Sequence, residues 1–213
     1  MKPTPGARPT LVLLVRHGLT ATTGRLLPGR APGLHLSDEG RRQADAVARR
    51  IAALPRVAAV YTSPLERARE TAMPIARARR LVLRVDRGLL EVDIGRWTGQ
   101  PIARASRKPE WQAVQRHPSG FRFPGGESFI EMQARVVSAL GRLVARHPGR
   151  TIVAVFHADP IKAAVAHALG AHLDLFQRIA IAPASVTAIA YRAHGPVVLT
   201  VNSMDGDLAK LQT

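Results

Sequence analysis

Cysteine is absent from this chain of 213 residues, and phenylalanine, tyrosine and tryptophan together make up only 4% of it. Without cysteine there is no disulfide framework and no thiolate to act as a nucleophile or metal ligand. With so few aromatic rings there is little surface on which nucleic-acid bases could stack. These two absences disfavour a disulfide-stabilised module and a protein that binds single-stranded nucleic acid.

Long hydrophobic runs are missing as well. No stretch approaches the roughly 20 apolar residues that a membrane-spanning helix needs, and the apolar run at residues 11–15 is too short for a convincing signal peptide. The glycine-rich patterns of nucleotide-binding loops, GxGxxG and GxxxxGK followed by Ser or Thr, do not occur. We therefore expect a cytoplasmic protein with no membrane partner.

Acidic residues are scarce, because 15 Asp and Glu stand against 31 Lys and Arg and give a formal net charge of +16. Three interpretations are open: a solvated surface that follows from an arginine-rich composition, attraction of anionic phosphate substrates, and binding of nucleic acid. We rank them in that order, because the basic residues are spread along the chain and form no polybasic tail.

Hydrophobic periodicity predicts alternating strands and helices. Strand-like runs occur near residues 11–15, 57–61, 81–85, 151–156, 185–191 and 197–201. Apolar stripes at helical spacing lie at residues 38–54, 65–75 and 129–144. Ser37 is a suitable N-cap for the first helix, and Pro64 suits the first turn of the second. We expect one α/β domain over residues 10–213, a three-layer α/β/α sandwich around a mostly parallel sheet, after a flexible tail at 1–9.

Residues 98–124 interrupt this alternation with several prolines, Pro109 and Pro118 among them, with Trp111 and with several basic side chains. An insertion at this place could cover a site and select its substrate. It could equally be a helix and loop with only packing duties.

Chemically distinctive side chains follow the predicted strands closely. Arg16 and His17 come directly after the run at 11–15, and His157 comes directly after the run at 151–156. Arg67 follows the run at 57–61 by a few residues. Ligands of open α/β sheets bind at the carboxyl ends of the strands. Together with one carboxylate, from Glu91 or Asp93 in the segment between them, two histidines and two arginines are the groups needed to transfer a phosphoryl group without a metal.

Six sequence blocks resemble those of the histidine phosphatase superfamily, also called the phosphoglycerate mutase-like family. The blocks are RHGLT at 16–20, LSDEGRRQA at 36–44, SPLERARET at 63–71, LEVDIGRWTG at 90–99, PGGES at 124–128 and FHADPIK at 156–162. They occur in the family's order and cover nearly the whole chain. The resemblance implies a phosphoglycerate mutase-like fold and a metal-independent phosphoryl-transfer activity with no cofactor.

The same resemblance implies roles for five residues. His17 is the histidine that is phosphorylated transiently, Arg16 and Arg67 bind the phosphate, His157 also contacts the phosphoryl group, and Glu91 protonates the leaving group. From physics alone, two flanking arginines would lower the pKa of His17 and keep its ring neutral. We name as substrate-binding candidates Thr20, Thr23, Glu127, Ser128 and Ala158.

The chain departs from the family pattern at two places. Thr23 stands where many relatives have Asn, and the second histidine is followed by Ala158-Asp159-Pro160 and Lys162 instead of Gly-Gly and a later Arg. This block resembles a subgroup often labelled phosphomutases. We expect hydrolysis of a small phosphorylated metabolite, with a phosphoglycerate mutase-type phosphomutase as the alternative and a non-catalytic phosphate- or nucleic-acid-binding module as the third reading.

Other candidate sites carry weaker signals. His157 with Asp159 could suggest a metal pair, but the sequence shows no cluster with metal-ligand spacing, and we expect no metal. Asp93 competes with Glu91 for the acid role, and Ser128 could contact a phosphate or cap a helix. The sequence is compatible with a homodimer.

Overall fold

Residues 8–211 are described by the computed structural model, whose centre is a six-stranded sheet. The strands are β1 (Thr10–Arg16), β2 (Ala59–Thr62), β3 (Leu83–Val85), β4 (Thr151–Phe156), β5 (Val186–Arg192) and β6 (Gly195–Ser203). Their order in the sheet is β3-β2-β4-β1-β5-β6. All six predicted strand regions are confirmed. The tail predicted at 1–9 lies outside the described residues except for Arg8 and Pro9.

Strands β3, β2, β4 and β1 run parallel, whereas β5 is antiparallel to both β1 and β6. The described sheet is therefore mostly parallel, as predicted, and it is mixed because β5 runs against the other five strands. The centre consists of β1 and β4, whose runs are apolar on both faces because helices cover both. Parallel pairing in register places Arg16 opposite Phe156, so these two strands end side by side.

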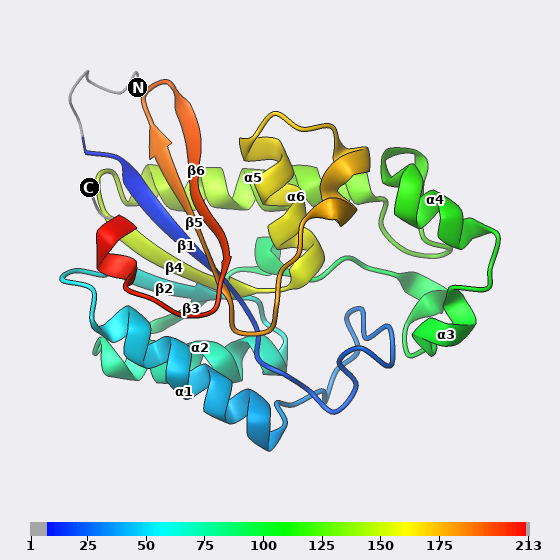
Figure 1. Ribbon diagram of the computed structural model, residues 1–213, viewed down its shortest axis with the longest axis horizontal. Coiled ribbons are helices and arrows are strands. Elements are labelled where there is room, and N and C mark those ends of the chain that lie inside the picture. Colours follow the sequence, from blue (N-terminus) through cyan, green and yellow to red (C-terminus); the bar gives the residue numbers. More distant parts are fainter. Residues whose placement is uncertain (1–7, 212–213) are drawn as a thin grey trace.

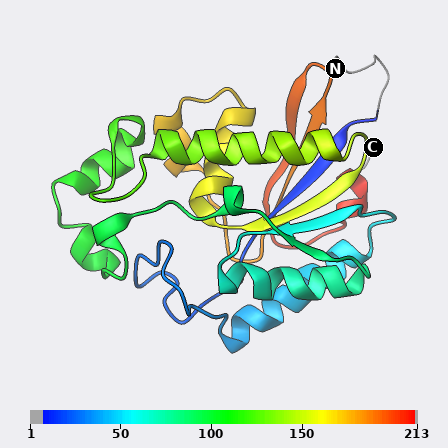
Figure 2. The ribbon, with the colours of Figure 1, turned by 180° about the vertical axis from the view of Figure 1, so that it is seen from behind.

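Helices pack in a layer on each face of the sheet, which confirms the predicted three-layer sandwich (Figure 1). On one face lie α1 (Asp38–Ala52) and α2 (Glu66–Ala78); on the other lie α5 (Phe129–Arg146) and α6 (Ala158–Ala168). Each face has its own core. Leu13 and Val15 pack toward α1 and α2, whereas Val12 and Leu14 pack with residues of α5 and α6. Figure 2 shows α5, in yellow-green, along the whole length of its face.

Of the two helix starts predicted from local sequence, the one at Ser37 is confirmed and the one at Pro64 is wrong. Ser37 caps α1, because its side chain accepts a hydrogen bond from the Gly40 N–H, as predicted. Pro64 does not lie in the first turn of α2. The helix begins at Glu66, and the two residues before it form the turn that leads from β2 into the helix.

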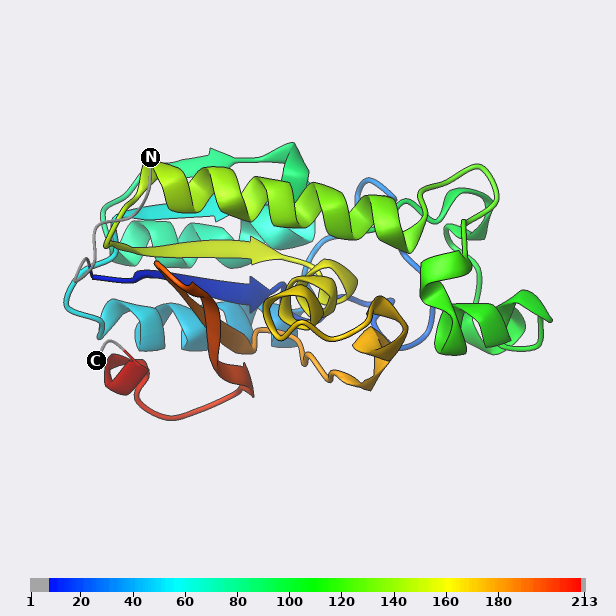
Figure 3. The same cartoon turned by 90° about the horizontal axis from the view of Figure 1, so that it is seen from above.

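The segment 98–124 contains two short helices, α3 (Ile102–Ala105) and α4 (Glu110–Arg116). In Figure 3 they lie at the end of the molecule toward which β1 and β4 point. The remaining helical turns are 3₁₀ helices at Arg87–Leu89, Gly95–Trp97, Pro118–Gly120, Leu173–Arg178 and Leu208–Leu211. Among the helices of residues 8–211, none is long and apolar enough to cross a membrane.

Candidate active site

The two predicted site histidines meet where β1 and β4 end. The His17 N–H donates to the Phe156 carbonyl at 2.9 Å, which continues the strand pairing one step past the end of β1. The rings of His17 and His157 contact edge to face, with centroids 5.3 Å apart. Both side chains are buried. Strand register therefore brings together two histidines that are 140 positions apart in the sequence.

The imidazole of His17 is oriented by the backbone. Its Nδ1 lies 2.8 Å from the Gly18 carbonyl. Because a carbonyl can only accept, Nδ1 carries the proton and Nε2 keeps its lone pair. Burial, then the positive charges of Arg67 and Arg16, lower the pKa of His17 to about 3. The ring is therefore neutral near pH 7, as predicted from the flanking arginines, although burial is the larger cause.

Both predicted phosphate-binding arginines are anchored at one end. Arg67, on the first turn of α2, is fully buried and its Nη2 donates to the Gly29 carbonyl at 2.8 Å. The Nη1 of Arg16 donates to the Ile181 carbonyl at 2.6 Å. The Nε of each arginine and Nη1 of Arg67 are buried without a hydrogen-bond partner. Since buried polar groups are normally paired, these unpaired donors mark a place for an anion.

His157 is held by Ser63, the residue that directly follows β2. Its Nε2 lies 2.8 Å from the hydroxyl of Ser63, while its Nδ1 is buried with no partner. Burial and then the Arg67 charge hold the pKa of His157 well below its usual range. His157 thus resembles the two arginines in having an anchored nitrogen together with an unpaired one.

Glu91 contributes a carboxyl group with a displaced pKa. Burial and the nearby Asp159 carboxylate raise the pKa of Glu91 to about 7, against the smaller opposing effects of Arg67 and Arg16. One oxygen of Glu91 accepts from the Val92 N–H at 2.9 Å. Asp93 differs: its side chain accepts from the Gly95 N–H at 3.0 Å and pairs with Arg30 at 3.5 Å. A carboxyl group with a pKa near 7 can both give and take a proton at neutral pH.

The backbone that carries Glu91 is fixed by two arginines that the sequence interpretation missed. Arg30 donates to the Glu91 carbonyl at 2.8 Å, and Arg135 donates to the carbonyls of Gly88 and Leu90, each at 2.9 Å. Glu127 joins them by ion pairs of 2.9 Å to Arg30 and 2.8 Å to Arg135. No local pattern distinguishes these arginines, because the backbone carbonyls that they hold lie 44 or more positions away in the sequence.

The other substrate-binding candidates have separate surroundings. Thr20 and Thr23 contact each other through their hydroxyl groups at 2.9 Å. Ser128 caps α5 in a reciprocal arrangement with Glu131, which is the alternative that its sequence position left open. Ala158 is the first residue of α6, directly after His157. Glu127 lies in the arginine network described above.

A cavity of about 180 Å³ lies beside this group of residues. Asp159, which raises the pKa of Glu91, is part of its wall. Most of the lining is apolar or aromatic, and the segment 98–124 supplies part of it. The lining residues are Leu27, Ile94, Trp97, Trp111, Val114, Gln115, Phe123, Phe129, Asp159 and Gln177.

Comparison with known proteins identifies the family. The model of the histidine phosphatase superfamily (branch 1) matches residues 12–204, so the chain belongs to this superfamily. Phosphoserine phosphatase 1 of Hydrogenobacter thermophilus is 32% identical over 197 residues, which cover 90% of this chain and 91% of that protein.

Further similarities extend to mycobacterial proteins. Bifunctional protein Rv2228c of Mycobacterium tuberculosis is 38% identical over 195 residues, and the match covers 89% of this chain. The chain spans about half the length of that relative, 53%. Among solved structures, a mycobacterial glucosyl-3-phosphoglycerate phosphatase has a TM-score of 0.83 at 26% identity, and the match covers 92% of this chain and 100% of that one.

Proposed function

We propose that this protein hydrolyses a small phosphomonoester through a phosphohistidine at His17, without a metal. The observation that carries the proposal is the set of unpaired buried donors on Arg16, Arg67 and His157 around the ring of His17. A phosphoryl group supplies oxygens for all of these donors at once. Its transfer depends mainly on positioning and charge stabilisation, which these residues provide.

In the first step, Nε2 of His17 attacks phosphorus while the ester P–O bond breaks. Glu91 in its acid form gives its proton to the leaving oxygen. In the second step, Glu91, now a carboxylate, takes a proton from water, whose oxygen attacks the phosphohistidine. The P–N bond breaks, inorganic phosphate leaves, and both residues return to their starting forms.

Charge stabilisation in this mechanism comes from the protein itself. Two guanidinium groups and the His157 N–H take the place that a divalent ion has in other phosphatases. Within residues 8–211, no group of three or more His, Cys, Asp or Glu side chains could hold a metal ion. We expect turnover to survive excess chelator; loss of activity that one divalent ion restores would contradict the proposal.

The leaving group is proposed to enter the cavity bounded by Asp159 and Trp111, so that the segment 98–124 covers it. The apolar lining favours an organic leaving group that presents carbon to the aromatic rings and a polar group to Asp159 or Gln177. Relatives named phosphoserine phosphatase and glucosyl-3-phosphoglycerate phosphatase support a small phosphorylated metabolite as substrate. The contacts expected from Thr20, Thr23 and Ala158, the homodimer and the cytoplasmic location stay predictions.

Mass spectrometry after a quench at alkaline pH tests the mechanism, because phosphohistidine is labile in acid. We expect a phosphoryl group on His17 during turnover and none in His17→Ala, which should be inactive. Wild-type turnover by His17→Ala would overturn the proposal. Transfer of the phosphoryl group to a second hydroxyl of the substrate, with no release of inorganic phosphate, would identify the mutase alternative.

A further inference from the structure

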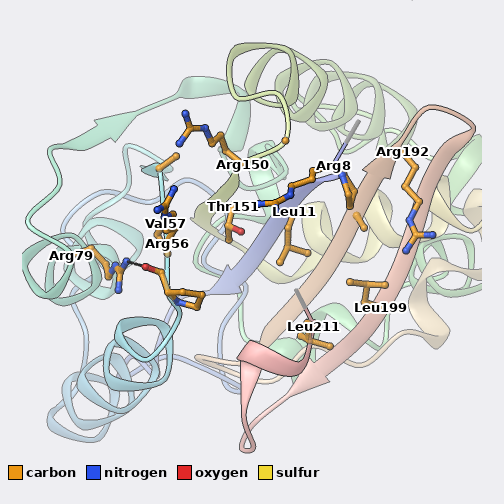
Figure 4. Close-up of a pocket in the computed structure, with 15 residues that line it drawn as sticks. Arg8, Leu11, Arg56, Val57, Arg79, Arg150, Thr151, Arg192, Leu199 and Leu211 are labelled. Carbon is orange, nitrogen blue, oxygen red and sulfur yellow. Dashed lines mark hydrogen bonds between the residues drawn. The ribbon is translucent and has the colours of Figure 1, made fainter. Parts of the chain in front are cut away.

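A second cavity, of about 880 Å³, lies at the opposite end of the sheet from the candidate active site (Figure 4). Leu11 and Thr151, at the beginnings of β1 and β4, line it. The same two strands end beside His17 and His157. Five residue steps of roughly 3.3 Å separate Leu11 from Arg16, so the two sites are about 16 Å apart along the strand. We call this cavity the arginine groove.

Five arginines line the arginine groove, and its described lining contains no Asp or Glu. They are Arg8, Arg56, Arg79, Arg150 and Arg192. Arg79 is occupied within the fold, because it donates to the carbonyls of Ala52 and Leu54 at 2.9 and 2.8 Å. Over residues 8–211, the other four make no ion pair with a carboxylate. Figure 4 shows Arg56 and Arg150 on one side of Leu11 and Arg192 on the other.

The gathering of these arginines around one cavity, and not the lack of ion pairs alone, makes the arrangement informative. Only six arginines of residues 8–211 pair with a carboxylate, namely Arg30, Arg41, Arg42, Arg122, Arg135 and Arg142. Gathering four guanidinium groups around one cavity without a carboxylate costs electrostatic repulsion, which an anionic ligand would relieve. Arginine is also the side chain best suited to bind phosphate oxygens through two hydrogen bonds.

Between the arginines the wall is aliphatic. Leu11, Val57, Ala190, Leu199 and Leu211 contribute to it, and the described lining includes no aromatic ring. A groove without aromatic rings cannot stack bases, which disfavours single-stranded nucleic acid as the occupant. The volume lies within the roughly 300–1,000 Å³ that is usual for small-molecule sites.

We propose that the arginine groove binds a small organic molecule that carries two or more phosphate groups. A single phosphate would engage only some of the four arginines, whereas a ligand with two or more spans both sides of the groove and rests its carbon skeleton on the aliphatic wall. This site is independent of the chemistry proposed for His17, since no residue of the groove belongs to the candidate active site.

Calorimetric titration with methylenediphosphonate tests the proposal, because its P–C–P linkage cannot be hydrolysed. The protein is first saturated with orthovanadate, which occupies the catalytic pocket as a mimic of transferred phosphorus. The test variant is Arg56→Gln/Arg150→Gln/Arg192→Gln, in which all three positions are exposed. The control variant, Arg49→Gln/Arg69→Gln/Arg87→Gln, removes the same charge from exposed positions outside the groove.

We expect one equivalent of diphosphonate to bind to the wild type and to the control, and affinity to fall at least about tenfold in the test variant. Thermal unfolding of both variants checks that the fold is retained. Equal weakening in the two variants, or no binding to the wild type, would overturn the proposal. If a labelled DNA duplex loses affinity only in the test variant while diphosphonate does not bind, the groove is a nucleic-acid surface and the proposal is wrong.

Discussion

The Nε2 atom of His157 lies 2.8 Å from the hydroxyl of Ser63, and both side chains are fully buried. The Ser63 oxygen also accepts from the Leu65 N–H at 3.4 Å. Its own proton is then free to be donated to Nε2, which places the ring proton of neutral His157 on Nδ1. The Ser63 hydroxyl would thereby turn the unpaired nitrogen of His157 into a donor for the phosphoryl group.

Ser63→Ala should lower kcat at least about tenfold, because His157 loses the partner that fixes its tautomer and orientation. The loss should be the same for alkyl and aryl phosphates, since His157 contacts the phosphoryl group and not the leaving oxygen. Steady-state kinetics on one substrate of each type measures it. Unchanged kcat, in a variant whose thermal unfolding shows the native fold, would remove Ser63 from this positioning role.

Glu91→Gln should slow alkyl phosphates far more than an aryl phosphate. An alkoxide needs a proton as the P–O bond breaks, whereas a nitrophenolate leaves with little help, so the difference should fall within the roughly 10²–10⁴-fold range of general acid catalysis. Asp93→Asn is the matched control, because Asp93 is held by Gly95 and Arg30. Equal losses on both substrates for Glu91→Gln, or a selective loss in Asp93→Asn, would contradict the assignment.

Asp159 should raise the pH at which kcat/KM begins to decline on the alkaline side, because its carboxylate raises the pKa of Glu91. The phosphorylation step needs protonated Glu91, whose pKa of about 7 predicts that kcat/KM for an alkyl phosphate declines as the pH rises through 7. The Asp159 carboxylate disfavours the charged form of Glu91. Asp159→Asn should therefore lower the pKa of Glu91 and move this decline to lower pH. A decline at the same pH in wild type and variant would show that Asp159 does not tune the acid.

Gly40→Ala should destabilise the protein, although alanine is the better helix former by about 1 kcal/mol. A Cβ at Gly40 would lie 2.0 Å from the Leu19 carbonyl oxygen, so α1 or the loop after His17 must move. We expect the free energy of unfolding to fall by about 1–3 kcal/mol. Gly141→Ala, in α5 with nothing within 4 Å of the added atom, should instead raise it by about 0.5–1 kcal/mol. Chemical denaturation of both variants measures these changes; stabilisation by both would show that the close approach of α1 to the loop is not tight.

Much of the fold followed from local patterns. The apolar runs predicted all six strands because a strand buried on both faces must be continuously hydrophobic, as β1 and β4 are. The predicted cap at Ser37 depends on a hydrogen bond three residues away and needs no distant partner. The antiparallel placement of β5 was not predicted, because strand direction depends on where the chain returns to the sheet and leaves no local pattern.

For the candidate site too, some features followed from the sequence and others only from the tertiary structure. The sequence by itself determined the residue types and the strand ends that carry His17, Arg16 and His157, since each lies within two residues of a predicted strand end. Only the tertiary structure decided which atoms are anchored and which are unpaired, how Arg30 and Arg135 hold the Glu91 backbone, and that arginines from distant segments line one groove. These features depend on contacts between residues tens of positions apart and on burial, and burial shifts a pKa only after the chain has folded around the group.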